Sequence, residues 1–563
     1  VLRNFHVPWS YSTHDFIEYW WKGQIFYKNK LMTIEKIVES LHLNNKSYGQ
    51  DTNHTIDSLR RLNGSFSIII ETAQYMLCVV DRIRSIPLFY SSVNNSLIIS
   101  DDANYLRELL DATFNEEHGA EFLVTGYVTG PDTLFDGIFQ LQAGEFLVFD
   151  KLSGNFSINS YFHYLHGNYS IESEEQHLTS LDEVMVSVFN RLIDTTTKKG
   201  KTIVVPLSGG LDSRLIVAML KRLGVKDVIC FSYGKTGNHE AEISKKVAEA
   251  LEYPWYFVEY TSRRWYDCHH SDEMRAYERY ASNFVSLPVI QDYLAVKILK
   301  EEGKIPDTAV FIPGHTGDMI SGGHIPRTYD QSSDYTFEKF LADNLKKHYN
   351  LWRWDRNELE SLFKEKTWKC VGDIFVNDNE SCANAIELFD FNERQAKFIV
   401  NSVRVYEFFG YDWRIPLWDA ELIDFFLKIP LLLRLDQKIY KKYCFKKVFN
   451  NEREPLSRIP CTTISGIPPS LPRMKILSHL WNTFFNPDIG TMCGFKNPNM
   501  ERFKCCLRGK SICDEKNIEI QGIKDILCIQ NNRFPSCNGI LTLLYLENLF
   551  HHIKMAKSNY PKL

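Results

Sequence analysis

The sequence predicts an α/β fold: a β-rich N-terminal sandwich with helices, followed by a doubly wound parallel sheet. Up to about residue 150, short apolar runs alternate with turn signals, which favours the sandwich. From about residue 178, strands alternate with amphipathic helices, which is the pattern of a parallel sheet covered on both faces. The length of 563 residues supports this division, because one hydrophobic core rarely serves so long a chain.

We expect four segments along the chain. A front domain over residues 1–150 is followed by a polar linker over 151–177, a parallel-sheet domain over 178–450 and a helical C-terminal extension over 451–563. In the front domain, strands are predicted at residues 24–27, 66–71, 75–81, 88–91, 97–100 and 145–150.

In the parallel-sheet domain, each predicted strand leads into a turn or a helix. Strand 203–207 precedes helix 214–223, strand 228–233 precedes helix 240–251, and strand 310–312 precedes a glycine-rich turn. Beyond residue 333 the pattern is mainly helical. Because the carboxyl ends of parallel strands meet at one edge, the polar turns after them are expected to form one site.

Composition and charge argue against several classes of protein. Charged residues make up 24% and hydrophobic residues 44%, and the net charge is −5. This balance predicts neither a nucleic-acid partner nor a membrane surface, because both would need a basic patch. The best apolar run, residues 422–435, is interrupted by charges and a proline, so no membrane span is expected. The thirteen cysteines include no Cys-x-x-Cys pair, which favours reduced cysteines in a cytoplasmic protein without a signal peptide.

The turn at residues 207–213 carries the strongest chemical signal. Its glycines let the backbone approach a ligand, and the free N–H groups of the following helix point at an anion. Ser208 and Ser213 can donate to phosphate oxygens, and Asp212 can hold magnesium. No Lys-Ser/Thr follows the glycines, so the turn is not a P-loop. The candidate phosphate-contacting residues are Leu207, Ser208, Gly209, Gly210, Asp212 and Ser213.

Two further strand ends fit the same chemistry. Asp318 lies in a second glycine-rich turn and could hold magnesium from the opposite side. The remaining candidate nucleotide-contacting residues are Ser232, Tyr233, Gly234, Gly314, Thr316 and Gly317. Five lysines crowd residues 438–447, where one could neutralise charge on a departing pyrophosphate, although such a run is often a solvated helix face.

These segments, taken in order, resemble the asparagine synthetase family. Residues 208–213 match its ATP signature, and they also resemble the pyrophosphate loop of ATP pyrophosphatases. Residues 313–323 occupy the place of its second loop, and residues 412–419 look like its Glu-x-Arg-Val-Pro-Phe-Leu-Asp. The resemblance implies a PP-loop domain that binds ATP and Mg²⁺, with Asp212 and Asp318 as metal ligands. By register, Lys442 falls on the family's pyrophosphate-contacting lysine.

The family's catalytic base is a point of departure. His315 stands where asparagine synthetases have glutamate, and an imidazole with an ordinary pKa of about 6.5 can accept a proton from an amine near neutrality. The alternative, that His315 binds phosphate or caps the loop, stays open. Glu393 lies near the stretch where cyclising relatives place a carboxylate partner, with a plain surface glutamate as the alternative.

The front domain resembles the family's glutaminase domain, an N-terminal-nucleophile sandwich, without its catalytic parts. The sequence begins at Val1 rather than at a nucleophilic cysteine, and the first cysteine, Cys78, falls on a predicted strand. Residues 22–24 read Lys-Gly-Gln where the family has Asn-Gly-Glu, and its Arg-Gly-Pro-Asp segment is missing. We therefore expect a scaffold without glutaminase activity.

The resemblance implies an enzyme that forms an amide bond by adenylating a carboxylate, converting ATP to AMP and pyrophosphate. The nitrogen nucleophile stays open: ammonia, ammonia from a partner protein, or an amine on the same or a second molecule. A glutamine-dependent asparagine synthetase or a sugar-acid amidotransferase is an alternative, as are a nucleic-acid thiolation enzyme and an inactive scaffold. The net charge of −5 and the absent cysteine pair disfavour thiolation, and oligomeric state, including a homodimer, stays open.

Overall fold

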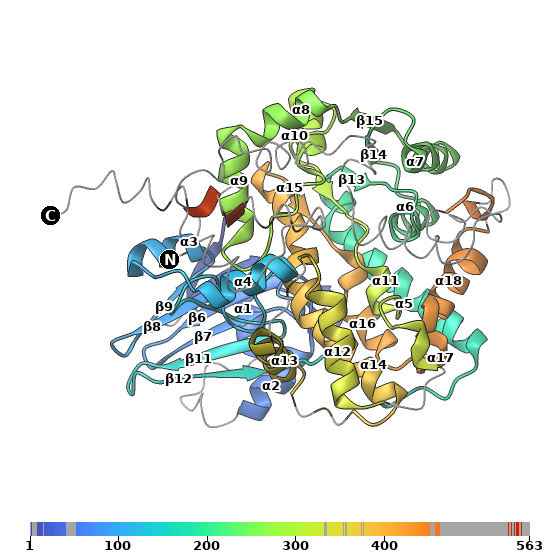
Figure 1. Cartoon of the computed structure of the whole chain (residues 1–563). Coiled ribbons are helices and arrows are strands. Elements are labelled where there is room, and N and C mark those ends of the chain that lie inside the picture. The colour runs from blue at the N-terminus through green and yellow to red at the C-terminus, as the bar shows by residue number, and fades with distance from the viewer. Residues whose placement is uncertain are drawn as a thin grey trace.

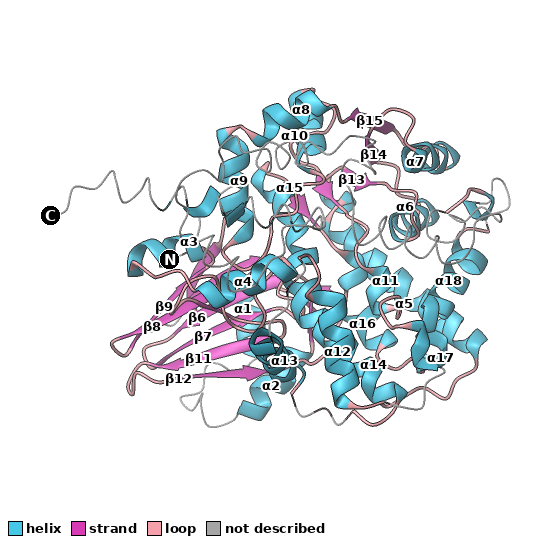
Figure 2. Cartoon of the chain, in the orientation of Figure 1, coloured by secondary structure: helices cyan, strands magenta, loops and turns pink. Residues whose placement is uncertain are grey.

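The computed structural model shows a β-rich domain beside a larger α/β domain (Figures 1 and 2). The structure describes residues 2, 8–14, 16–40, 52–330, 335–352, 354, 357–372, 374, 376–450 and 456–461. Towards the C-terminus it describes residues 539, 542, 545, 546, 548–550 and 553. Most of the predicted extension 451–563, including all of its cysteines except Cys461, therefore lies outside the described residues. The predicted α/β fold class is confirmed.

A six-stranded antiparallel sheet, in the order β1-β2-β6-β7-β11-β12, forms the centre of the front domain. Its strands are β1 Ser10–His14, β2 Ile17–Gly23, β6 Phe66–Glu71, β7 Tyr75–Val80, β11 Glu145–Asp150 and β12 Phe156–Ser160. A second sheet contains β8 Phe89–Val93, β9 Ser96–Ser100 and β10 Phe139–Gln140. A small third sheet contains β3 Phe26–Tyr27, β4 Lys30–Leu31 and β5 Leu62–Asn63.

Alternation along β6 explains why both faces of the main sheet are covered. Ile68 and Ile70 join a core that includes Ile37 of α1 Ile34–Ser40, and Ile69 joins a separate core that includes Leu88 and Ile99 beside the second sheet. Successive side chains of a strand point to opposite faces, so an unbroken isoleucine run is buried on both. Helices α2 Thr52–Arg60, α3 Ala103–Leu110 and α4 Glu116–Thr125 complete the domain.

The α/β domain is built on a five-stranded parallel sheet in the order β15-β14-β13-β16-β17. The strands are β13 Ile203–Pro206, β14 Val228–Gly234, β15 Trp255–Glu259, β16 Val310–Phe311 and β17 Asp412–Trp413. The strand order reverses at β13, so the turns after β13 and β16 flank the crevice where ligands bind in such sheets.

Helices make up most of the remaining described chain. Those of the first half of the α/β domain are α5 Glu174–Thr195, α6 Asp212–Arg222, α7 His239–Ala250, α8 Ser262–His269, α9 Asp272–Ser282, α10 Tyr293–Glu301 and α11 Gly317–Ile320. Those of the second half are α12 Phe337–His348, α13 Asn357–Val371, α14 Asn379–Asp390, α15 Arg404–Phe408, α16 Ala420–Phe426, α17 Leu431–Arg434 and α18 Lys438–Tyr443. A π-helix, Phe391–Ile399, continues directly from α14.

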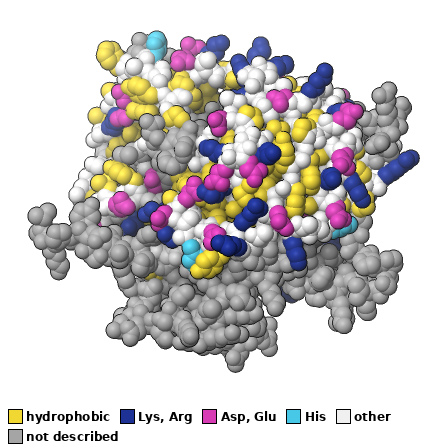
Figure 3. Space-filling model, turned by 90° about the horizontal axis from the view of Figure 1, so that it is seen from above, with side chains coloured by type: hydrophobic (Ala, Val, Ile, Leu, Met, Phe, Trp, Pro, Cys, Tyr) yellow, Lys and Arg dark blue, Asp and Glu magenta, His cyan; other side chains and the backbone are white. Residues whose placement is uncertain are grey.

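Two features of the fold bear on the sequence predictions. Strand β12 lies inside the stretch predicted as a linker, because it pairs with β11 and completes the main sheet. No helix in the described ranges is long and apolar enough to cross a membrane. On the face shown in Figure 3, basic and acidic side chains are intermixed over the described part of the surface.

Candidate active site

A cavity of about 450 Å³ opens at the carboxyl edge of the parallel sheet. Its walls come from the turn after β13 (residues 206–213), the turn after β16 (residues 313–318) and the segment 399–405 after the π-helix. Among the predicted residues, those that line it are Ser208, Gly210, Asp212, Ser213, Tyr233, Gly314, His315, Thr316 and Asp318. The structure thus brings together two loops that lie about a hundred residues apart in the sequence.

The turn after β13 is held open by its serines. The Ser213 hydroxyl accepts the Ser208 N–H at 3.1 Å, and the two hydroxyl oxygens lie 3.1 Å apart. The Ser208 hydroxyl in turn accepts the Gly210 N–H at 3.1 Å. Helix α6 begins at Asp212, with no side-chain cap on its first turn. The first N–H groups of the helix are therefore available to an anion in the cavity.

Two glycines of the second turn permit the close approach of the loops. A Cβ atom at Gly314 would lie 2.8 Å from the Ser213 nitrogen. At Gly317 it would lie 2.6 Å from an Asp212 carboxylate oxygen, closer than real Cβ contacts allow. Gly317 thus allows α11 to begin directly against the Asp212 carboxylate. This close approach forms the cradle into which a phosphate chain would fit.

Asp212 and Asp318 face one another across this cradle. The Asp318 N–H donates to Asp212 Oδ2 at 3.2 Å, and the Tyr440 hydroxyl donates to Asp212 Oδ1 at 2.8 Å. Burial, with the charge of Asp318 added, raises the pKa of the Asp212 carboxyl. Burial opposes the ionisation of Asp318 as well, but the charge and hydrogen bond of His324 hold its pKa below the ordinary value.

This carboxylate pair fits a magnesium ion that is shared with a phosphate chain. No group of three or more His, Cys, Asp or Glu side chains within the described ranges is arranged to hold a metal. Magnesium prefers six oxygen ligands and is commonly held by one or two carboxylates plus phosphate oxygens and water. Asp212 and Asp318 would thus hold the ion only together with a bound nucleotide.

His315 lies at the other end of the cavity, against the segment after the π-helix. Its Nε2 lies 2.8 Å from the Ser402 hydroxyl oxygen, and its buried Nδ1 has no hydrogen-bond partner in the described structure. Burial lowers the pKa of this imidazole to about 4, although the charge of Asp318 opposes the shift. The expectation of a histidine titrating near neutrality is therefore wrong for the free protein, because burial disfavours the charged ring.

Comparison with known families identifies the chain. A family model for asparagine synthase matches residues 187–455, the part that carries this cavity. A model for a glutamine amidotransferase domain matches residues 48–162. The chain belongs to the asparagine synthetase family. The matches support an ATP-dependent amidotransferase or ligase with a glutamine amidotransferase-like front domain.

Solved structures overlap this synthetase loosely. A glutamine phosphoribosylpyrophosphate amidotransferase from B. subtilis is 10% identical, over 45% of this chain and 73% of its own, with a TM-score of 0.17. The NH3-dependent NAD synthetase from Campylobacter jejuni is 13% identical, over 35% of this chain and 94% of its own, with a TM-score of 0.19. The glutamine-dependent NAD+ synthetase from Acinetobacter baumannii is 12% identical, over 74% of this chain and 62% of its own, with a TM-score of 0.20. Scores this low carry no argument, and no curated protein matches the chain.

Two predicted catalytic residues of the synthetase lie outside the cavity lining. Lys442, on α18, forms an ion pair with Glu174 of α5, and its side chain is 28% exposed. Glu393 is fully buried in the π-helix, where it pairs with Lys397 at 2.5 Å and accepts the Gly130 N–H at 3.1 Å. Glu393 is neither a surface residue nor the partner of His315, since that place belongs to Ser402.

The other predicted residues belong to the loops without lining the cavity. These are Leu207, Gly209, Ser232, Gly234 and Gly317. Leu207 is buried beneath the turn after β13, and its N–H donates to the Phe231 carbonyl at 2.8 Å. Gly317 acts by permitting the close approach described above.

Several residues at or beside the cavity were not predicted from the sequence as site residues. Asp292 lines the cavity and accepts hydrogen bonds from the predicted Tyr233 at 2.6 Å and from Tyr406 at 2.5 Å, so it fixes both rings. Gln437 and Glu240 also line the cavity. Glu240 follows the predicted strand 228–233, whereas Gln437 has no motif around it in the sequence. Tyr440 could have been predicted most easily, since it lies within the lysine-rich run that forms α18.

Cys78, the first cysteine of the front domain, is not an exposed nucleophile. Cys78 lies in β7, fully buried, and burial raises its thiol pKa far above the ordinary value. Lys22, near the end of β2, is itself buried, and its ammonium lies 3.9 Å from Glu407 Oε1 of the synthetase domain. The ion pair between Lys22 and Glu407 thus joins the front domain to the synthetase domain.

Proposed function

We propose that the chain activates a substrate carboxylate with ATP, forming an acyl-adenylate and releasing pyrophosphate, and then forms an amide with a nitrogen nucleophile. One observation carries the proposal: a single cavity gathers the open amino end of α6, the Ser208 and Ser213 hydroxyls, and the facing carboxylates Asp212 and Asp318. This set of groups suits the phosphates of ATP and a magnesium ion between them. Magnesium, when bound, would neutralise charge developing on the leaving pyrophosphate.

The first half-reaction needs positioning more than acid–base catalysis. The substrate carboxylate oxygen bonds to the α-phosphorus, and the bond from that phosphorus to pyrophosphate breaks. The α6 N–H groups and the serine hydroxyls orient the phosphates so that the carboxylate attacks in line. A carboxylate is already ionised at neutral pH, so no side chain has to remove a proton in this step.

The second half-reaction needs a proton acceptor, and His315 suits that role. In the tautomer whose Nε2–H donates to the Ser402 hydroxyl, the acceptor would be Nδ1, which is unpartnered and buried in the free protein. The nucleophile's nitrogen bonds to the acyl carbon, the bond to AMP breaks, and Nδ1 takes the proton. The lowered pKa keeps this ring neutral throughout the physiological range and also makes it a weaker base than an ordinary imidazole.

The nitrogen donor and the carboxylate stay open as classes. Ammonia, ammonia delivered by a partner, or an amine on the same or another molecule would satisfy the geometry, and a sugar acid would satisfy it as the carboxylate. We further propose that the front domain does not hydrolyse glutamine, because Cys78 is buried and Lys22 is engaged with Glu407. Purified protein should release no glutamate from glutamine above background, with or without ATP.

A product assay tests the main proposal. Carboxylates and amines are screened with ATP and magnesium, and AMP, ADP, pyrophosphate and phosphate are quantified. AMP with pyrophosphate is expected, and Asp212→Ala or Asp318→Ala should remove most of it while the protein stays folded. Asp194→Ala is the matched control, since Asp194 pairs with Lys198 on the exposed surface of α5. ADP with phosphate as the products of a cognate substrate would overturn the proposal.

A further inference from the structure

A second cavity, larger than the first, lies where the front domain meets α13. Its volume is about 620 Å³. The front domain contributes the loop 129–132, the stretch 142–145 and residues around 160–165, and the synthetase domain contributes the end of α13 and the segment after it. None of its lining residues lines the synthetase cavity, so the two are separate sites.

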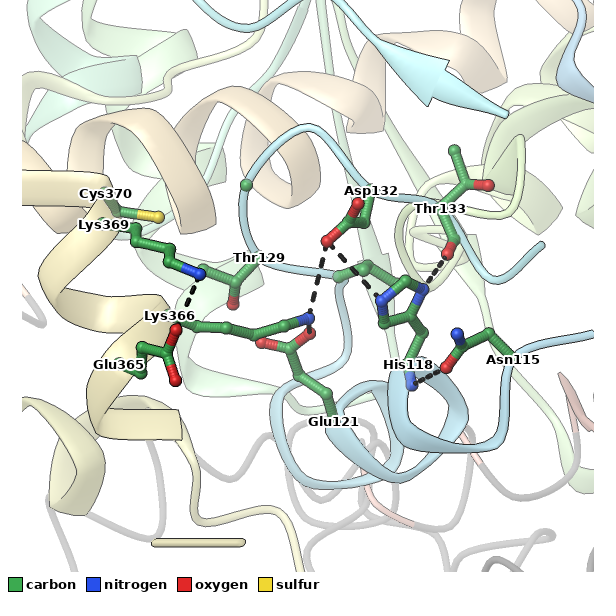
Figure 4. Close-up of polar contacts among 12 residues, drawn as sticks. Asn115, His118, Glu121, Thr129, Asp132, Thr133, Glu365, Lys366, Lys369 and Cys370 are labelled. Carbon is green, nitrogen blue, oxygen red and sulfur yellow. Dashed lines mark hydrogen bonds and ion pairs between the residues drawn. The ribbon is translucent and has the colours of Figure 1, made fainter. Parts of the chain in front are cut away.

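A chain of alternating charges crosses the domain interface along one wall (Figure 4). Lys366 of α13 pairs at 2.7 Å with Glu121, a fully buried carboxylate of α4, and lies 3.9 Å from Asp132. His118 lies 3.5 Å from Asp132 on the far side, and its Nδ1 is 2.7 Å from the Thr133 carbonyl oxygen. The Lys366 ammonium therefore lies between two carboxylates, which leaves little of its positive field for the cavity.

A second part of the lining presents the carboxylate of Glu145. Glu145, at the start of β11, accepts the Gln142 N–H at 2.7 Å, and it forms no ion pair with any described residue. Burial raises the pKa of this carboxyl above its ordinary value, although its hydrogen bonds with Gln142 and the charge of Lys397 oppose the shift. The other lysine of the cavity, Lys369, is occupied by Glu365 at 2.7 Å on the outer rim.

Apolar side chains cover the space between these walls. Leu362, Ile374 and Leu388 come from the synthetase domain, and Leu165 comes from the front domain. The volume exceeds what a metal ion or a few waters would fill and lies within the usual range for small-molecule sites. A ligand that suits both features carries a positive group for the carboxylates and an apolar body for the leucines.

We propose that this cavity binds a small organic cation, a primary ammonium on an apolar stem, with the ammonium on Glu145 and the stem on the apolar lining residues. A charge-assisted hydrogen bond to a largely buried carboxylate is among the stronger polar contacts available to a ligand. The proposal does not depend on the reaction at the synthetase cavity, since the two cavities share no residue.

Calorimetric titration of the full chain with n-hexylammonium tests the proposal, with 1-hexanol and hexanoate as probes of equal stem length. Hexylammonium should bind at least about 10-fold more tightly than either probe, with one site per chain. Glu145→Gln should weaken binding by about 10-fold to 100-fold, because glutamine keeps an oxygen for the Gln142 N–H and removes the charge. Asp132→Asn should weaken it less, since Asp132 already faces Lys366 and His118.

Glu71→Gln is the matched control. Glu71 lies on β6 of the same sheet, is paired with Lys151 and does not line the cavity, so its variant should bind hexylammonium within twofold of the parent. Thermal melting of each variant checks that it is folded. Equal binding of hexylammonium and hexanol, tighter binding of hexanoate, or unchanged binding by folded Glu145→Gln would each overturn the proposal. Saturating magnesium–ATP should leave hexylammonium affinity within threefold, and full competition would place the ligand in the synthetase cavity instead.

Discussion

At the scale of single residues, the proposed amide-forming step depends on the neutral imidazole of His315, which lies against the Ser402 hydroxyl. Replacing His315 with alanine should slow product formation by about 10²–10⁴-fold, the usual contribution of a general base, while pyrophosphate exchange into ATP is spared. Ser402→Ala should give a smaller loss of about 10-fold, because the ring keeps its acceptor but loses the bond that orients it. The two half-reactions are measured separately, by exchange and by product formation.

A different result for His315→Ala would assign the ring another role. If His315→Ala abolishes exchange and amide formation equally, the ring binds phosphate and the base lies elsewhere. Ser321→Ala is a suitable control, because Ser321 bonds to the Gly317 carbonyl in the same region without lining the cavity. That variant should retain the relative rates of the two steps.

The lowered pKa of His315 also predicts acid sensitivity. In the unfolded chain the ring has its ordinary pKa of 6.5, whereas in the folded protein it is about 4. Between these values the unfolded chain binds a proton that the folded protein excludes, so the free energy of unfolding falls as pH falls. The penalty grows by ~1.4 kcal/mol per pH unit and reaches about 3 kcal/mol near pH 4.

Chemical denaturation of the parent and of His315→Gln, compared from pH 7.5 to 4, measures this penalty. Glutamine does not titrate, so the variant should lose less stability than the parent across the window. The difference between the two proteins isolates His315 from other titrating groups. Parallel pH dependence for both proteins would show that burial does not exclude the proton from this ring.

At this scale the sequence predicted the loops better than their partners. Asp212, Asp318 and His315 were found because each follows a predicted strand in a short motif. Ser402 and Tyr440 were not predicted, because they come from helices far along the chain, and only tertiary packing brings them to His315 and Asp212. Glu393 was predicted as a catalytic partner or a surface residue, because the sequence does not show that it is buried in an ion pair with Lys397.

At the scale of helices and strands, α5 connects the two domains through Arg191. Arg191 donates from Nε and Nη2 to both oxygens of Asp419, at 2.9 and 2.7 Å, and also reaches Asn29 of the front domain at 2.6 Å. The side chains of Arg191 and Asp419 are only 4% and 11% exposed. Removing the cation therefore leaves a buried carboxylate without its charge partner.

Arg191→Met should lower the free energy of unfolding by about 3–5 kcal/mol, measured from the first transition in urea. Arg222→Met provides the comparison, because Arg222 makes a similar two-oxygen contact with Asp182 at the surface. That pair is 39% and 26% exposed, so its loss should cost no more than about 1 kcal/mol. Equal effects of the two substitutions would show that the Arg191 contact adds nothing through burial.

The element predictions succeeded where the hydrophobic pattern was strong. Strands at 66–71 and 145–150 match β6 and β11 residue for residue, and the helix predicted at 240–251 is displaced from α7 by one residue. The pattern failed for β12, whose Phe-Ser-Ile-Asn-Ser sequence is largely polar and reads as linker. Pairing with β11 fixes that strand, and sequence alone does not show pairing.

At the scale of the whole molecule, the buried pair Glu393–Lys397 joins the domains. Both side chains are fully buried, and Lys397 also donates to the front-domain carbonyls of Val128 and Gly130, at 3.1 and 2.6 Å. Glu393 accepts the Gly130 N–H in return. One ion pair thus holds the front-domain turn against the π-helix, which continues towards the synthetase cavity at Ile399.

A double-mutant cycle tests this arrangement. Lys397→Met should destabilise the protein by about 3–5 kcal/mol, because it strands a buried carboxylate and two carbonyls, and Glu393→Gln should do the same to the ammonium. The double variant removes both charges, so its loss should be smaller than the sum of the single losses by at least ~1 kcal/mol. Denaturation curves of the four proteins at pH 7.5 give the coupling free energy. Strict additivity would mean that the pair contributes nothing to stability beyond its separate side chains.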